Sequence, residues 1–271
     1  MQTQDNKLSL INGRIHTQSS IASNITIEHG RIVSVDADPG TLDGAGKVID
    51  LHGRTVLPGF CDTGCDFLGW AENQERLNLS SLPSPKNLAA ALASYSRANT
   101  DPLRGWYIAH GLPASYIITH EDIDAVIPSR PCAIIDAGFT HAVLNTPAMT
   151  EFNMPQDNVE LDEFTQHLPP LSEEDILTLV KTYAPRANAS GITEIWSDFH
   201  GDASRLWDIF FNEAYDILTL RVRCNFGFDD VGALNEFLSA GLRTGDGLPF
   251  CKLGGIIVKG NLDQQEQKNI I

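Results

Sequence analysis

Residues 58–66 contain two carboxylates, Asp62 and Asp66, that could take part in chemistry. The sequence of this stretch is Pro-Gly-Phe-Cys-Asp-Thr-Gly-Cys-Asp. Alternate residues of a β-strand point to the same side, so Asp62, Gly64 and Asp66 are predicted to share one face of a strand. Two carboxylates on one face could bind a divalent metal ion or hold a proton between them. The alternative is structural, with one carboxylate capping a turn and the other pairing with an arginine. Cys61 and Cys65 fall on the opposite face, where packing is expected rather than zinc ligation.

Strands that alternate with helix-period segments must position these residues. From Pro58 onward this alternation predicts βα units and a parallel sheet, in which catalytic residues lie at the C-terminal ends of strands. His110 and His200 follow predicted strands, where they could point into a barrel mouth or be ordinary buried or surface histidines. The predicted strands are 59–67, 106–110, 132–136, 192–197, 220–226 and 256–259, and the predicted helices are 86–99, 121–127, 172–189, 203–215 and 231–240.

The first 57 residues follow a different pattern of short apolar runs separated by turns. Asn12-Gly13 is a strong two-residue hairpin signal, and His29-Gly30 separates two further apolar runs. The pattern predicts a small antiparallel β unit ahead of the parallel sheet.

Charge and composition exclude several classes of function. Over 271 residues, 19 Lys and Arg face 35 Asp and Glu, a net charge of −16 that argues against a nucleic-acid or anionic-membrane partner. No stretch approaches the roughly twenty apolar residues of a membrane helix, and the polar N-terminus lacks the order of a secretion signal. Five cysteines, an odd number, fit reduced thiols better than a disulfide framework. We therefore expect a cytoplasmic protein.

Several short motifs, in order and at regular spacing from about residue 8 to about residue 263, resemble the amidohydrolase superfamily and specifically amidohydrolase family 3. Three lie in its opening segments and three further along the chain. They are Asn12-Gly-Arg-Ile-His16, Ile27-Glu-His-Gly-Arg-Ile-Val33, residues 48–60, residues 123–132 with Pro-Ser-Arg-Pro, Asn145-Thr-Pro-Ala-Met149 and Ala189-Ser-Gly-Ile-Thr193.

The resemblance implies an α/β fold in two parts. Residues 1–57 would form the N-terminal part of a small composite β-sandwich built from both chain ends, and residues 58–271 the first half of a partial (β/α)₈ TIM-like barrel with an insertion. It also implies a metal-dependent hydrolase of carbon-nitrogen bonds other than peptide bonds. One or two divalent ions, zinc in the first instance, would activate water against a small amide-like substrate.

At the first barrel strand the sequence departs from the pattern. The family's Asp-x-His-x-His appears as Asp62, Gly64 and Asp66, so one metal ligand is lost and an oxygen replaces an imidazole nitrogen. Lys259 matches the position of a metal-bridging lysine, with a solvated strand-end lysine as its alternative. Asp263 matches an aspartate a few residues further on. The resemblance thus implies Asp62, Asp66 and Lys259 as metal ligands and Asp263 as the catalytic residue.

Two more residues are candidates for substrate binding by the same resemblance. His141 lies near the family's Gly-His pair, although its spacing to the following asparagine is one residue short, and Asn145 begins the Asn-Ser-like segment.

Three hypotheses therefore remain open. The chain is an active divergent hydrolase, a catalytically inactive relative that binds no metal and acts as a scaffold or binding module, or a fragment of a longer hydrolase. The predicted strands reach only about the fourth barrel strand, and such a half barrel would expose an edge and an apolar face, which favours a homodimer.

Overall fold

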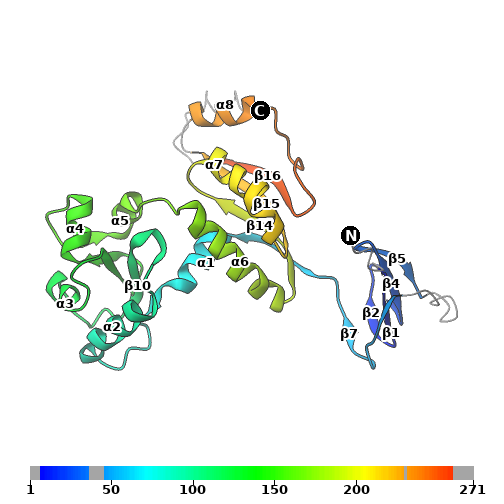
Figure 1. Ribbon diagram of the computed structural model, residues 1–271, viewed down its shortest axis with the longest axis horizontal. Coiled ribbons are helices and arrows are strands. Elements are labelled where there is room, and N and C mark those ends of the chain that lie inside the picture. The colour runs from blue at the N-terminus through cyan, green and yellow to red at the C-terminus, as the bar shows by residue number, and fades with distance from the viewer. Residues whose placement is uncertain (1–6, 37–45, 229–230, 259–271) are drawn as a thin grey trace. The chain divides into compact units, whose positions relative to one another are not determined.

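The computed structural model describes residues 7–36, 46–228 and 231–258. The chain divides into two compact units, Met1–Phe60 and Cys61–Ile271 (Figure 1). No helix in the described ranges is long and apolar enough to cross a membrane.

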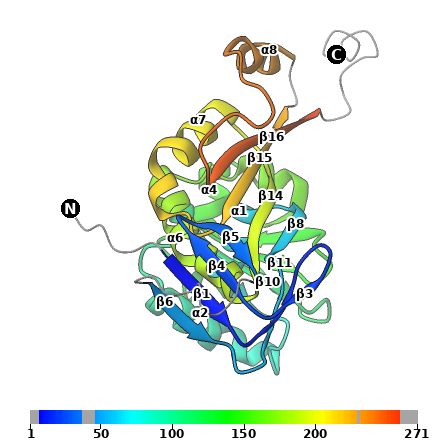
Figure 2. The same cartoon turned by 90° about the vertical axis from the view of Figure 1, so that its right-hand side faces the viewer.

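The N-terminal unit consists of two small sheets (Figure 2). One has the order β5-β4-β1-β6 and the other β3-β2-β7, with β1 parallel to β6 and β2 parallel to β7, so the prediction of an antiparallel unit is wrong for these pairs. The strands are β1 (Lys7–Ile11), β2 (Arg14–His16), β3 (Ile21–Ala22), β4 (Ile25–Glu28), β5 (Arg31–Val35), β6 (Lys47–Asp50) and β7 (Thr55–Val56).

The two predicted turns have different outcomes. His29 and Gly30 join paired strands β4 and β5, and both have positive φ (51° and 74°), as a tight two-residue hairpin requires. Asn12 also has positive φ (55°), but β1 and β2 belong to different sheets, so the Asn12-Gly13 hairpin prediction is wrong. The turn instead moves the chain from one sheet to the next, where Gly13 N–H donates to the Ser23 carbonyl.

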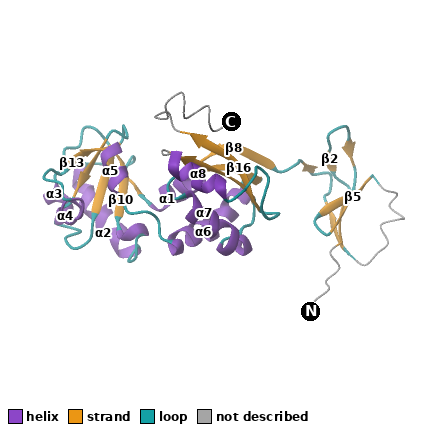
Figure 3. Ribbon diagram, turned by 90° about the horizontal axis from the view of Figure 1, so that it is seen from above, coloured by secondary structure: helices purple, strands orange, loops and turns teal. Residues whose placement is uncertain are grey.

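A four-stranded sheet with the order β16-β15-β14-β8 organises the second unit. It is built from β8 (Phe60–Cys65), β14 (Ile192–Phe199), β15 (Arg221–Phe228) and β16 (Cys251–Val258). β15 runs parallel to both neighbours. Helices cover one side of it (Figure 3), namely α1 (Phe67–Glu75), α6 (Glu173–Ala189), α7 (Ala203–Asp208) with a following π turn at Ile209–Glu213, and α8 (Val231–Ser239).

Side chains alternate across this sheet. Ile195, Phe199, Val222 and Phe226 are buried in the core shared with the helices. The intervening residues of β14 and β15 are more exposed and mostly polar, and they occupy the opposite face. The expectation of an open apolar face is therefore wrong. The described part of the chain shows a mixed α/β fold, while the partial (β/α)₈ barrel and the composite β-sandwich remain predictions.

An inserted segment between α1 and α6 forms its own five-stranded sheet with the order β13-β12-β11-β10-β9. β9 to β11 are parallel, β12 and β13 antiparallel, and apolar clusters lie on both faces. Its elements are β9 (Leu77–Asn78), the 3₁₀ turns Pro85–Asn87 and Leu103–Gly105, α2 (Leu88–Ala98), β10 (Tyr107–Leu112), α3 (His120–Asp124), β11 (Cys132–Asp136), β12 (His141–Leu144), α4 (Thr146–Phe152), β13 (Asn158–Glu160) and α5 (Leu161–His167).

Candidate functional site

The β8–α1 junction carries the two predicted carboxylates. Asp62 lies in β8, where its Oδ1 accepts a hydrogen bond from Gly64 N–H at 3.2 Å. Asp66 lies beyond the end of the strand, because β8 stops at Cys65. Its Oδ1 accepts from Gly69 N–H at 2.9 Å and caps α1. The capping alternative is thus confirmed for Asp66, and the prediction that it shares a strand face with Asp62 is wrong.

The two cysteines beside these carboxylates differ. Cys65 packs against the core, and burial together with the charges of Asp62, Asp66 and Asp198 raises its pKa to about 11. Its packing against the core agrees with the expected packing role of Cys65. Cys61 is exposed, so the prediction that it packs is wrong.

Polar pairs follow along the neighbouring strands, on the face away from the helices. Asn225 Nδ2 donates to Asp198 Oδ1 at 3.0 Å, and Arg223 Nε donates to Glu194 Oε1 at 2.9 Å. Burial alone would raise the pKa of the Glu194 carboxyl, but the hydrogen bonds from Arg223 and Trp196 and the charges of Arg223 and Arg221 together hold the pKa below its ordinary value. Sequence reasoning missed these pairs, although the alternation of polar and apolar residues along 194–199 and 221–226 was a signal for them.

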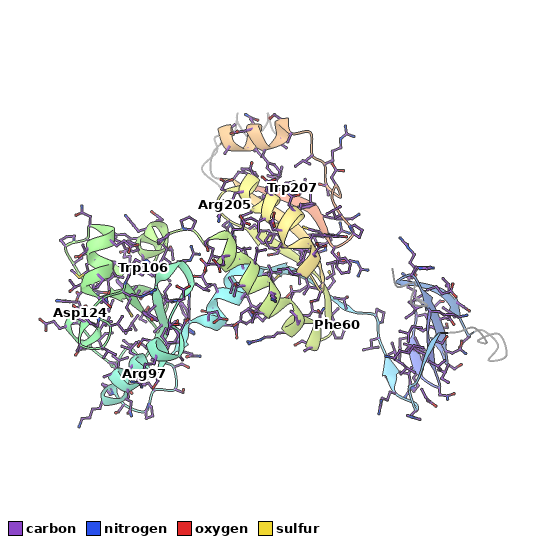
Figure 4. The ribbon with its side chains drawn as sticks, in the orientation of Figure 1. Phe60, Arg97, Trp106, Asp124, Arg205 and Trp207 are labelled. Carbon is purple, nitrogen blue, oxygen red and sulfur yellow. The ribbon has the colours of Figure 1, made fainter. Side chains whose placement is uncertain are left out.

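A cavity of about 350 Å³ lies at the ends of β8 and β14, among α1, α6 and α7. Its apolar wall includes Leu68, Ile176, Phe199 and Leu206, and Arg205 of α7 (Figure 4) contributes to its polar part. The remaining lining residues are Asp66, Gly69, Glu72, Arg104, Pro170, Leu171, His200, Gly201 and Asp202. A cavity of this size can hold a small organic molecule.

Arg104 reaches this cavity from the inserted segment. Its Nε and Nη2 donate to the two carboxylate oxygens of Glu72 at 3.2 and 3.0 Å, and Nη1 donates to the Pro169 carbonyl. Arg76 binds the same carboxylate at 2.9 Å. Burial alone would raise the pKa of Glu72, but the two arginines hold it below its ordinary value. Arg104 has a φ of 59°, a left-handed conformation that is uncommon outside glycine.

The predicted substrate-binding residues lie in the inserted sheet, a different sheet from that of Asp62. His141 is exposed, and its Nδ1 lies 3.0 Å from Thr140 Oγ1. Asn145 is fully buried and caps α4. Its Oδ1 accepts from Cys132 and Ala148 N–H, and its Nδ2 donates to the Ile127 and Arg130 carbonyls. The structure therefore gives Asn145 a structural role, which a sequence motif alone does not distinguish from a binding role.

The described residues do not fit a divalent metal ion by themselves. Gly64 has no ligand atom, Asp66 is engaged as a helix cap, and no group of three histidine, cysteine or acidic side chains in the described ranges is arranged to hold a metal. Lys259 and Asp263 lie outside the described residues. No metal-dependent step follows from the described residues alone.

Sequence comparison identifies the family of the chain. The model of the amidohydrolase family (Amidohydro_3) matches residues 47–248, well over half of the sequence. The chain belongs to this family, amidohydrolase family 3.

Two curated relatives match parts of the chain. The exoenzymes regulatory protein AepA of Pectobacterium carotovorum is 30% identical over 156 residues, which are 51% of this chain and 32% of that protein. The putative amidohydrolase YtcJ of Bacillus subtilis is 31% identical over 88 residues, 31% of this chain and 16% of that protein. The matched residues thus span a third or less of either relative.

Two solved structures share the fold. Uncharacterized metal-dependent hydrolases from Pyrococcus horikoshii and Pyrococcus furiosus each superpose with a TM-score of 0.77, at 20% and 18% identity. The match covers 92% of this chain in both cases, but only 54% and 55% of those chains. These neighbours show that the chain shares their fold over about half of their length.

Proposed function

We propose that the chain takes part in the hydrolysis of a carbon-nitrogen bond, other than a peptide bond, in a small amide-like substrate. The observation that carries this proposal is the family match over residues 47–248, which includes β8, β14 and β15 with their polar ends. The adjoining cavity of about 350 Å³ offers apolar walls for the body of such a molecule and polar groups for its head. A cytoplasmic location remains part of the same proposal.

The residue roles implied by family resemblance are proposals too. By the resemblance, a divalent ion, zinc in the first instance, would be held by Asp62, Asp66 and Lys259, with Asp263 as the catalytic residue. Asp66 caps α1 in the structure, so it would have to give up its hydrogen bond from Gly69 N–H to bind the ion. When bound, such an ion lowers the pKa of water and polarises a carbonyl. The residues of the described site have their own tasks: Arg104 and Glu72 fix one wall of the cavity, and Asp62 supplies a carboxylate at the strand face. His141 remains a proposed substrate contact.

A second candidate function is a catalytically inactive relative that acts as a scaffold or binding module. The specific observation in its favour is Gly64, at which the family's strand would supply an imidazole. An ideal Cβ built on Gly64 meets no heavy atom of the described residues within 4 Å apart from its chain neighbours, so no described side chain fills the space that the imidazole would occupy.

Native mass spectrometry combined with elemental analysis separates the two candidates. The hydrolase proposal predicts a stoichiometric divalent ion that the Asp62→Asn variant loses, and turnover in a panel of N-acyl amines, carbamates and cyclic amides. Lys181→Gln, on the exposed side of α6, is the matched control and should keep both properties. A metal-free chain that turns over no member of the panel would refute the hydrolase proposal and support the inactive relative.

A further inference from the structure

A β-bulge interrupts the sheet β16-β15-β14-β8 on the face away from the helices, here called the polar face. The register of β15 and β16 shifts by one residue between Cys224 and Phe226. The residue between them, Asn225, therefore faces two glycines of β16, Gly254 and Gly255. Bulges of this kind re-aim a side chain and are common at barrel rims and next to active sites.

The orientation of the Asn225 amide follows from its partner on β14. Asn225 Nδ2 donates to Asp198 Oδ1 at 3.0 Å, and because a carboxylate only accepts hydrogen bonds, the amide nitrogen must face β14. The amide oxygen consequently points the other way, over the bulge of β16. An ideal Cβ built on Gly254 would overlap Asn225 Oδ1, so the absence of a side chain at Gly254 makes room for this oxygen.

Two acceptor oxygens are left on neighbouring strands by this arrangement. Asp198 and Asn225 stand directly opposite each other in register, and neighbouring strands lie about 4.8 Å apart. In the part of the chain that the structure describes, neither Asp198 Oδ2 nor Asn225 Oδ1 accepts a hydrogen bond, and Asp198 has no cationic partner. Adjacent acceptors that together carry one negative charge suit a planar cation with two N–H donors.

A flat, partly apolar surface lies beside these acceptors. An ideal Cβ built on Gly227 would lie 3.1 Å from His200 Nδ1, so the imidazole ring leans over this glycine. Ile257 stands opposite Gly227 in register, and it faces the polar side because its neighbour Ile256 packs with the helices. The surface over Gly227 is thus bounded by an aromatic ring and an aliphatic side chain, which suits the apolar body of a ligand.

We propose that this part of the polar face binds a substrate that carries an amidinium or guanidinium group. Asp198 Oδ2 and Asn225 Oδ1 accept hydrogen bonds from its N–H groups, and the body of the molecule lies against His200 and Ile257. The proposal rests on the proposed hydrolase function, since it names the group by which the amide-like substrate is held. Asp198 and Asn225 are then residues that determine specificity, and they disfavour a carboxylate in the same place.

Three ligands of the same shape test the proposal through binding alone. Benzamidine, benzamide and benzoate share a phenyl ring and differ in the charge and donors of the head group. Isothermal titration should show that benzamidine binds at least about tenfold more tightly than benzamide and that benzoate does not bind measurably. In the Asp198→Asn variant, the affinity for benzamidine should fall to about that for benzamide.

The two glycines of the bulge provide a matched pair of variants. Gly254→Ala pushes the amide oxygen of Asn225 aside without removing a polar group, and the fold should persist because only the end of a side chain has to move. In Gly255→Ala the ideal Cβ lies 3.5 Å from the same oxygen, an ordinary contact. Neither glycine has a positive φ, so alanine fits the backbone at both. Gly254→Ala should therefore weaken benzamidine binding at least about fivefold, whereas Gly255→Ala should leave it unchanged.

The outcomes separate this proposal from the proposed function. Benzamidine binding no tighter than benzoate binding, or an equal effect of the two alanine variants, would overturn the binding proposal. Should Gly254→Ala melt early in circular dichroism, Asn225→Leu removes the same acceptor and should weaken benzamidine binding equally. A chain that hydrolyses uncharged amides without preferring benzamidine keeps the proposed function and loses this site. A chain that prefers benzamidine through Asp198 and turns over no amide keeps the site and loses the hydrolase proposal.

Discussion

Replacement of Arg104 by alanine is expected to lower the free energy of unfolding by about 3 kcal/mol. The side chains of Arg104 and Glu72 are 15% and 8% exposed, and two hydrogen bonds join their charged groups. Loss of one partner from a buried ion pair costs about 3 to 5 kcal/mol, and the lower figure applies because Arg76 still neutralises Glu72. With an m-value of about 3 kcal/mol/M, the urea midpoint should fall by about 1 M.

The Arg104→Gly variant separates the effect of losing the ion pair from the effect of backbone strain on stability. At a φ of 59° glycine is unstrained, whereas alanine in a left-handed conformation costs about 1 kcal/mol. The order of stability should therefore be the natural sequence, then glycine, then alanine. Fluorescence of the buried neighbour Trp106 and far-UV circular dichroism both report the transition. A glycine variant less stable than the alanine variant would refute the argument from strain, and a loss below about 1 kcal/mol in both would refute the argument from the ion pair.

The ion pair of Arg104 and Glu72 makes the free energy of unfolding depend on pH. Because the pKa of Glu72 is lowered in the folded chain, its stabilisation is fully present above the ordinary carboxyl pKa of about 4.3 and is lost as pH falls through the lower folded value. The difference between the natural sequence and Arg104→Ala should therefore be largest near neutral pH and shrink below about pH 4.

Three further predictions concern the site and its supports. Gly64→His combined with Asp66→His should bind zinc more tightly in isothermal titration, at a cost of about 1 kcal/mol for the lost α1 cap; an unchanged titration would favour a fragment over a nearly complete site. Asn145→Ala should cost about 3 kcal/mol in urea unfolding, because three buried backbone groups and one partly buried backbone group lose their partner, and a cost near zero would contradict its structural role. Maleimide labelling of the native protein should spare the buried thiols, and modification before unfolding would refute their burial; these are Cys132, Cys224 and Cys251.

Local signals in the sequence predicted the longer elements well. The capping box at Ser172 and the apolar run after it fixed the start of α6, and β11 lies at 132–136 as predicted. Short elements such as β12, β13 and α5 were missed, because their three to seven residues carry too little periodicity. The Asn12-Gly13 signal failed because pairing with more distant strands decided the sheet of β1 and β2.

Only those interactions of the candidate site that join residues close together in sequence could be predicted. Asp66 as a helix cap follows from its position just before α1, three residues ahead of the N–H it binds. The contacts of Arg104 could not be predicted, because its partners Glu72 and Pro169 lie 32 and 65 residues away in sequence. No motif of neighbouring residues marks such a contact.

The sparse core of the N-terminal unit has a consequence during protein synthesis. Its described part fully buries a cluster of Ile15, Ala22 and Ile25, with four partly buried apolar residues packed against it, while Ile32 and Val48 are more than half exposed. A few buried side chains at about 1.5 to 3 kcal/mol each cannot offset an ordering cost of about 1 to 2 kcal/mol for every residue. Such a unit is expected to be unfolded while it is being synthesised, with its apolar strands accessible to chaperones.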